Sequence, residues 1–220
     1  MSSHLDREIR DLKSKLLSLS LLVEENLSVA VKAIKNRDLE LSKKVRATDF
    51  EIDKKEVEVE EECLKLLALY QPVAIDLRFV IAALKINSDL ERIGDLSVSI
   101  SKRVRFLTKL PAADFPYDYE ELAKAAKSMV KKSIQSLVDM DSDLARQICV
   151  DDDKVDMLNK KSIELVYEKI NQKPENTQAY IHFLSISKNL ERIADYATNI
   201  AEDVIYLVDG DIVRHEGAEL

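Results

Sequence analysis

Eight acidic residues form four pairs in which the two acids are four positions apart. The pairs are Asp49 with Asp53, Glu91 with Asp95, Asp152 with Asp156, and Glu191 with Asp195. On an α-helix, residues at this spacing share one face, and two like charges there destabilise an isolated helix by roughly 0.2 to 0.5 kcal/mol. A cation held between the carboxylates would remove this penalty. Oxygen-only ligands suit Mg, Ca, Mn or Fe, so the pairs predict metal sites; the alternative interpretation is an ordinary solvated acidic face.

The composition limits the kinds of element that can carry these acids. The 220 residues include 3 glycines and 4 prolines, whereas average usage of roughly 12% would give about 26. A β-sandwich or a doubly wound α/β fold needs frequent turn residues, and a phosphate-binding P-loop needs glycines and a lysine at fixed spacing. The glycines Gly94, Gly210 and Gly217 supply neither. We therefore predict an all-α protein with long helices and short connections.

Prolines and apolar periodicity divide the chain into six helical runs. The predicted helices cover roughly residues 5–36, 38–70, 72–110, 118–140, 143–171 and 175–208. Asp38 is the expected N-cap of the second helix, and Gly210 is the expected stop of the last. The segment 111–116 contains two prolines and is the predicted linker between a first domain at residues 1–110 and a second at 117–220.

An internal repeat relates the two predicted domains. At an offset of 100, residues 84–107 and 184–207 share 10 identities in 24 positions, including Leu-Glu-Arg-Ile-x-Asp at 90–95 and 190–195. The second and fifth runs correspond at an offset of 103, which aligns Asp49 with Asp152 and Asp53 with Asp156. Duplication of an ancestral unit explains both correspondences. The fold class predicted from the sequence is therefore two tandem three-helix bundles, with six long helices related by internal duplication.

Apolar residues at seven-residue spacing identify the core-facing side of these helices. At about 100° per residue, Glu91 and Asp95 project away from that side, whereas Asp49 and Asp53 border it. Spacing alone leaves open whether Asp49 and Asp53 reach the same ion as Glu91 and Asp95. The predicted seams are Ile86, Ile93, Ile100 and Leu107, their repeats Ile186, Ile193, Ile200 and Leu207, and Val45, Ile52, Val59 and Leu66.

The charge balance bears on partners and location. With 33 basic and 41 acidic residues, the formal net charge is -8, which opposes non-specific binding to nucleic acid or an anionic membrane. No apolar run approaches the ~20 residues that span a bilayer, and the apolar run 16–23 is followed by Glu24 and Glu25 rather than by a signal cleavage site. We expect a cytoplasmic protein with no nucleic-acid partner, no membrane insertion and no organic cofactor.

Three segments together resemble the PhoU family, and the resemblance covers essentially the whole chain. They are Asp-Leu-Glu-Arg-Ile-Gly-Asp at 89–95, the segment 190–203 that begins Leu-Glu-Arg-Ile-Ala-Asp, and Gln-Pro-Val-Ala-Ile-Asp-Leu-Arg at 71–78. The resemblance implies a cytoplasmic regulator that represses the phosphate-starvation response when phosphate is plentiful. It also implies two partners, the ATPase subunit of the phosphate ABC transporter and the phosphate-sensing histidine kinase.

The same resemblance implies a ligand set for metal. Some PhoU proteins bind multinuclear iron or zinc clusters through acid-x-x-x-acid motifs, and the matching positions here are Asp49, Asp53, Glu91, Asp95, Asp152, Asp156, Glu191 and Asp195. One position departs from the family pattern. Ser99 stands where the family often has asparagine, as Asn199 does in the second repeat, so the first cluster is expected to differ from the second in composition or occupancy.

Two other functions fit the residues less well. A carboxylate-bridged di-metal enzyme would use Glu-x-x-His pairs on its helices, but none of His4, His182 and His215 lies three positions after a glutamate. A purely structural, metal-free adaptor would share the fold and the partners. A homo-oligomer is also expected, because the long helices are accompanied by Phe106, Phe115 and Tyr117, which are expected to be exposed.

Overall fold

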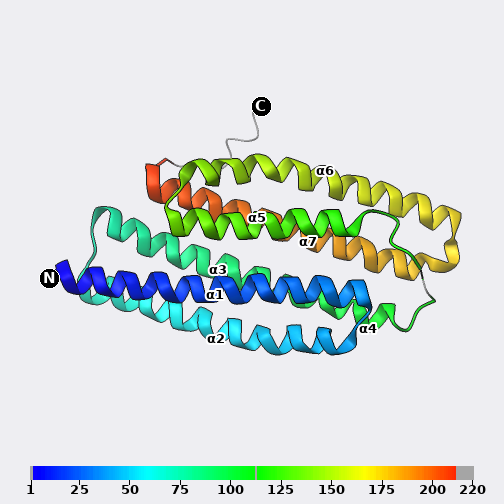
Figure 1. Ribbon diagram of the computed structural model, residues 1–220, viewed down its shortest axis with the longest axis horizontal. Helices are drawn as coiled ribbons and strands as arrows, with labels where there is room; N and C mark the ends of the chain where they lie inside the picture. The colour runs from blue at the N-terminus through cyan, green and yellow to red at the C-terminus, as the bar shows by residue number, and fades with distance from the viewer. Residues whose placement is uncertain (1, 112, 212–220) are drawn as a thin grey trace.

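The protein is built from six long α-helices joined by short connections (Figure 1). The computed structural model describes residues 2–111 and 113–211, and no strand is present in these two ranges. The all-α prediction is confirmed. The elements are α1 (Ser2–Asn36), α2 (Leu39–Tyr70), α3 (Ala74–Lys102), α4 (Val104–Leu107), α5 (Tyr119–Asp139), α6 (Ser142–Gln172), the 3-10 turn η1 (Pro174–Asn176) and α7 (Thr177–Asp209).

The helix ends show why the sequence folds into these elements. The Asp38 carboxylate accepts hydrogen bonds from the backbone N–H groups of Glu40 and Leu41, so the predicted N-cap is confirmed. Asp118 and Asp141 cap α5 and α6 in the same way. Gly210 ends α7 at a φ of 81°, in the left-handed region that favours glycine. The third predicted helix differs from the structure, because it breaks at Arg103 into α3 and the short α4.

The helices form two groups of three. In Figure 1, α1, α2 and α3 lie together below α5, α6 and α7, and the long axes of all six run nearly along one direction. The two groups meet where α3 packs against α7. Their buried side chains make one continuous hydrophobic core. The predicted domain boundaries, 1–110 and 117–220, stay a prediction.

The core is made of the predicted seams. Burying one such isoleucine or leucine side chain stabilises the fold by roughly 1.5 to 3 kcal/mol. The heptad pattern therefore accounts for how each helix is rotated, and that rotation decides where the acidic residues lie. The buried seam residues are Val45, Ile52, Val59 and Leu66 of α2, Ile86, Ile93 and Ile100 of α3, Leu107 of α4, and Ile186, Ile193, Ile200 and Leu207 of α7.

The α3–α7 contact contains an ion pair between the two halves. Lys85 of α3 places its ammonium 3.2 Å from a carboxylate oxygen of Asp203 on α7. Asp203 is only 2% exposed, and the Lys85 ammonium also lies 6.0 Å from the centre of the Tyr206 ring. The pair links α3 to α7 in addition to the apolar packing.

The linker before α5 is packed against the second group of helices. Phe115 stacks on Tyr119 and on Phe183, with ring centres 4.7 and 4.0 Å apart. The Tyr117 hydroxyl donates a 2.7 Å hydrogen bond to the backbone oxygen of Phe183. Tyr117 is buried and Phe115 is half-buried. The expectation that both are exposed oligomer contacts is therefore wrong, because their rings fill the space beside Phe183; only Phe106 of the three is exposed.

Candidate functional site

Three carboxylates converge between α6 and α7. Asp152 and Asp156 lie one turn apart on α6, and Asp195 faces them from α7. One carboxylate oxygen from each of the three lies within 4.8 Å of the others. Such a group offers hard oxygen ligands to a single cation. Among the described residues this is the only group of three or more potential ligands that meets this limit.

The environment of Asp152 distinguishes it from a solvated surface acid. Its side chain is half-buried, and its Oδ1 atom is shielded from solvent without a hydrogen-bond partner. Burial, followed by the charges of Asp195 and Asp156, raises the pKa of Asp152 to about 7. The neighbouring Asp151 behaves differently, because it pairs with Lys132 of α5 and its pKa is lowered. An unpartnered buried oxygen beside two other carboxylates is the arrangement that a cation would complete.

Glu191 lies one turn before Asp195 on α7 and adds to the same negative field. Burial and the charges of Asp195 and Asp156 raise the pKa of Glu191. Burial and Asp156 also raise the pKa of Asp195. No lysine or arginine among the described residues forms an ion pair within 4.0 Å of Asp152, Asp156, Glu191 or Asp195. Arg192 acts against the raised pKa of both Glu191 and Asp195, and Lys188 against that of Glu191, but the repulsion among the acids and their burial outweigh these charges.

The equivalent acids of the first half form a looser arrangement between α2 and α3. Asp49 is half-buried, and burial, Asp53 and Asp95 raise its pKa to about 6, while Lys102 lowers it. Burial and Asp95 raise the pKa of Glu91. The residues do face one another across the two helices, but no three of them bring ligand atoms within the 4.8 Å found in the second half.

Gly94 explains how Asp49 fits against α3. A Cβ atom built on Gly94 would lie 3.3 Å from Asp49 Oδ1 and from two side-chain carbons of Ile52. The absence of a side chain there lets Asp49 approach the α3 backbone. The second half has Ala194 at the equivalent position, so the two acid clusters are built on differently shaped helix surfaces.

The helical projection placed these side chains correctly. Asp95 is exposed and Glu91 is half-buried, while the seam residues next to them are buried. Asp49 and Asp152, which the projection put at the border of the seam, are half-buried, and Asp53, Asp156 and Asp195 are exposed. None of the eight acids therefore lies in the buried core.

Side-chain hydrogen bonds at equivalent positions of the two halves, near the acidic clusters, were not predicted from the sequence. Asn87 of α3 donates through its amide nitrogen to the backbone oxygen and to a carboxylate oxygen of Glu56 on α2, both at 3.0 Å. At the equivalent positions of the second half, Ser187 donates to Asn159 at 2.7 Å. The sequence pattern that could have indicated these hydrogen bonds is a polar residue at a position of the repeat that is otherwise apolar. They lock α2 to α3 and α6 to α7 beside the acidic residues.

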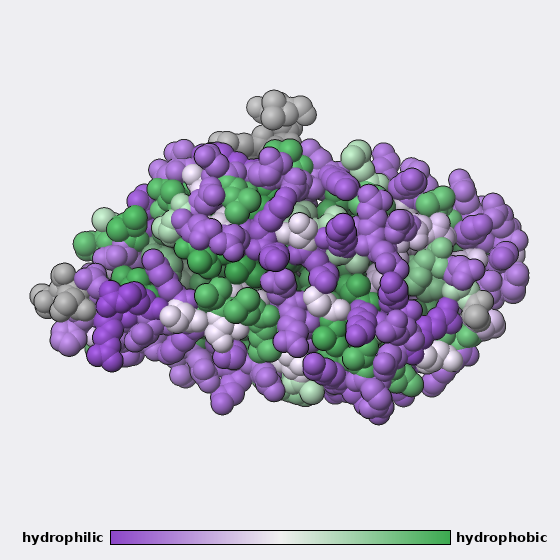
Figure 2. Space-filling view, viewed as in Figure 1, coloured by the Kyte–Doolittle hydropathy of each residue, from purple (hydrophilic) through white to green (hydrophobic). Residues whose placement is uncertain are grey.

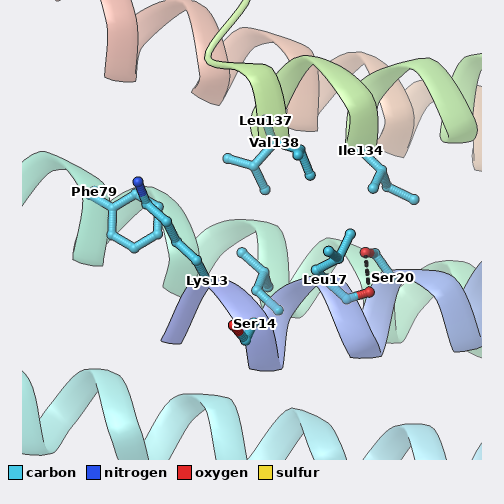
Figure 3. A pocket seen from close by; sticks show the side chains of 9 residues that line it. Lys13, Ser14, Leu17, Ser20, Phe79, Ile134, Leu137 and Val138 are labelled. Atoms are coloured by element: carbon cyan, nitrogen blue, oxygen red, sulfur yellow. Dashed lines mark hydrogen bonds between the residues drawn. The ribbon is translucent and has the colours of Figure 1, made fainter. Parts of the chain in front are cut away.

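The pocket between α1, α3 and α5 does not pair groups suited to acid–base catalysis. The apolar pocket in Figure 3, about 150 Å³ in volume, lies between α1, α3 and α5 and is lined by Leu17, Phe79 and Ile134, among other residues. Lys13, whose ammonium lies 5.0 Å from the centre of the Phe79 ring, is its one charged lining residue. On the face shown in Figure 2, apolar side chains gather over α1 and α5 within a largely hydrophilic surface. The pocket contributes no nucleophile–base pair.

The histidines do not join the acidic clusters. His182 lies on α7 and stacks on Phe106, with ring centres 5.0 Å apart, and burial together with Arg103 lowers its pKa. His4 is exposed on α1, and His215 lies outside the described residues. The ligand group between α6 and α7 consists of carboxylates alone. Within the described part of the chain, no helix is long and apolar enough to span a bilayer.

The fold and site together define a class: a duplicated all-α protein whose distinguishing surface is a set of carboxylates between paired helices. The family model of the PhoU domain matches twice, at residues 16–104 and 119–204. Each match spans one of the two repeats. The chain belongs to the PhoU family.

Individual relatives agree with this assignment. The chain is 34% identical over 220 residues to the phosphate-specific transport system accessory protein PhoU homolog of Pseudomonas aeruginosa, an alignment that covers 99% of this chain and 90% of the relative. It is 32% identical over 208 residues to the phosphate-specific transport system accessory protein PhoU homolog 1 of Thermotoga maritima. That alignment covers 94% of this chain and 90% of the relative. The crystal structure of PhoU from P. aeruginosa superimposes with a TM-score of 0.89 at 33% identity, covering 94% of this chain and 99% of that one. The crystal structure of the phosphate transport system regulatory protein PhoU from Streptococcus pneumoniae superimposes with a TM-score of 0.86 at 30% sequence identity. That superposition covers 95% of this chain and 99% of the other.

Proposed function

We propose that this protein is a non-enzymatic regulator of phosphate uptake and of the phosphate-starvation response. It acts in the cytoplasm as an adaptor between the phosphate ABC transporter, through its ATPase subunit, and the sensor histidine kinase. The observation that carries this proposal is the full-length match to proteins named as accessory proteins of the phosphate-specific transport system.

The acidic cluster between α6 and α7 is proposed to bind a metal ion. Its donor set fits iron, manganese, magnesium or calcium, and zinc can also take carboxylate ligands. Two observations support the fit: the convergence of Asp152, Asp156 and Asp195, and the unpartnered buried Oδ1 of Asp152. A bound cation would supply positive charge that cancels the repulsion among the carboxylates. Asp152 and Asp156 would hold it from α6, and Asp195 from α7.

These residues would couple the metal to the shape of the surface. Asp152 and Asp156 are fixed to α6, whereas Asp195 is fixed to α7, so shared ligation ties the two helices together along that groove. The first-half acids, Asp49 and Asp53 on α2 with Glu91 and Asp95 on α3, are proposed as a second site of lower affinity. Their ligand atoms are further apart, so binding there requires side-chain rearrangement before coordination.

The regulatory role is tested in cells that lack the gene. A phosphate-starvation reporter should be repressed at high phosphate in the complemented strain and derepressed in the deletion strain. Co-purification with the transporter ATPase subunit and with the kinase tests the two partners separately. Unchanged repression in the deletion strain would contradict the proposed function. Elemental analysis of protein purified without chelator tests the metal independently, since a metal-free adaptor would still restore repression.

A further inference from the structure

One face of α2 carries apolar residues that the fold does not bury. Phe50, Val57 and Leu64 are 67%, 48% and 54% exposed, and they follow one another at seven-residue spacing. They form a ridge about 21 Å long, at 1.5 Å per residue. Val57 projects roughly 140° away from the core-facing Ile52. Single exposed apolar residues are normal, but three on one stripe match the seam of a helix that pairs with another helix.

The second half of the molecule shows that the fold does not require this ridge. At the repeat-equivalent positions of α6, an offset of 103, the chain has Asp153, Lys160 and Tyr167. Asp153 and Lys160 are exposed polar residues on a helix that packs into the same kind of three-helix group. The exposed apolar residues of α6, Val150 and Met157, correspond instead to Ala47 and Lys54 and lie on a different side. The ridge of three apolar residues is therefore not repeated on α6, which keeps only the exposed Tyr167 at these positions.

The charges beside the ridge indicate what could cover it. Asp53 and Glu60 border the ridge on its α3 side, about 40° and 60° from Val57. Neither is within 4.0 Å of a lysine or arginine in the described part of the chain. Over its whole length, α2 carries nine acidic and six basic residues, a net charge of -3. A helix that docks on the ridge would meet uncompensated negative charge along one flank.

We propose that the ridge formed by Phe50, Val57 and Leu64 is a docking surface for an amphipathic helix of a partner protein with lysine and arginine beside its apolar seam. Apolar knobs from the partner would pack between the three ridge residues. Its basic side chains would pair with Glu60, and with Asp53 when the weaker α2–α3 metal site is empty. A second copy of α2 fits less well. Antiparallel pairing through the ridge would set acidic flank against acidic flank, which is destabilising.

The test uses the full-length protein and two synthetic helical peptides of three heptads. Both peptides have leucine along one seam; one has lysine on both flanks, and its charge-inverted twin has glutamate. Wild type should bind the lysine peptide at least tenfold more tightly than the glutamate peptide by fluorescence anisotropy. Phe50→Asp with Val57→Lys should weaken binding at least tenfold, because both changes remove the apolar seam without changing net charge. These are the residues that α6 itself carries, so the helix should still form.

The matched control is Val150→Asp with Met157→Lys on α6. It removes two exposed apolar residues, 63% and 66% exposed, with the same charge change, and it should bind the lysine peptide as wild type does. Binding that survives the α2 substitution, or that is lost equally in the control, would overturn the proposal. So would a dimer in sedimentation that the α2 substitution dissociates, since the occupant would then be a second copy. Metal content should be unchanged in the α2 variant. A result that contradicts the docking surface would therefore leave the metal proposal standing, and the reverse also holds.

Discussion

Ser187 Oγ lies 2.7 Å from Asn159 Oδ1, and this buried hydrogen bond joins α7 to α6 one turn from the acidic cluster. Ser187→Ala removes the donor and leaves the Asn159 amide oxygen short of a partner. An unmet buried hydrogen bond costs about 1 to 3 kcal/mol, so we expect the free energy of unfolding to fall by roughly that amount in urea titration. Ser128→Ala, on the exposed face of α5, is the control and should change it by less than ~0.5 kcal/mol. Equal stability of the two variants would contradict the structural role.

The two acid clusters should differ in metal affinity. Asp152→Asn with Asp195→Asn removes one ligand from each helix of the converging group and should abolish the tightest bound equivalent in elemental analysis and calorimetry. Asp49→Asn with Asp95→Asn should affect only weaker binding, because the α2–α3 acids are less tightly gathered. Asp143→Asn with Glu175→Gln, at two exposed acids outside the clusters, controls for the change of two charges. Loss of the tightest site in the Asp49/Asp95 variant would reverse the proposed order.

In the metal-free protein, stability should depend on pH through Asp49 and Asp152. Their pKa values, about 6 and about 7, are raised above 3.8, the ordinary value for an aspartate. The folded state therefore binds more protons than the unfolded state between about pH 4 and 7. Stability therefore falls as pH rises through that window. The melting temperature measured in chelator should decrease from pH 5 to pH 8. Asp152→Asn should flatten the upper part of this decrease; an identical slope in that variant would rule out Asp152 as its source.

Much of the architecture followed from periodicity and composition. Scarce glycine predicted long helices, and the seven-residue spacing of Ile86, Ile93 and Ile100 fixed which side of α3 is buried. The repeat offset predicted the two groups of three. The break at Arg103 was missed, because residues 104–107 keep the apolar rhythm and only backbone geometry separates α4 from α3.

The acidic site was only partly predictable for a related reason. The pairs on one helix follow from four-residue spacing, but whether Asp195 reaches Asp152 depends on the distance and rotation between α6 and α7. These depend on side-chain packing, including the hydrogen bond between Ser187 and Asn159, whose geometry the sequence does not give. The two clusters also differ at Gly94, which is replaced by Ala194 in the second half. The sequence shows this difference of one methyl group, but only the structure shows that Asp49 packs against Gly94.

Tyr117 provides a final test of the packed linker. Its hydroxyl donates to the Phe183 backbone oxygen at 2.7 Å, and its ring is 8% exposed. Tyr117→Phe should cost about 1 kcal/mol, the usual value of one such hydrogen bond, and Tyr117→Ala about 3 to 5 kcal/mol, because a buried aromatic ring leaves a cavity. Sedimentation should give the same oligomeric state for both variants as for wild type at a temperature where all remain folded. A change of oligomeric state in Tyr117→Phe, with unchanged stability, would instead place the ring at an interface between copies.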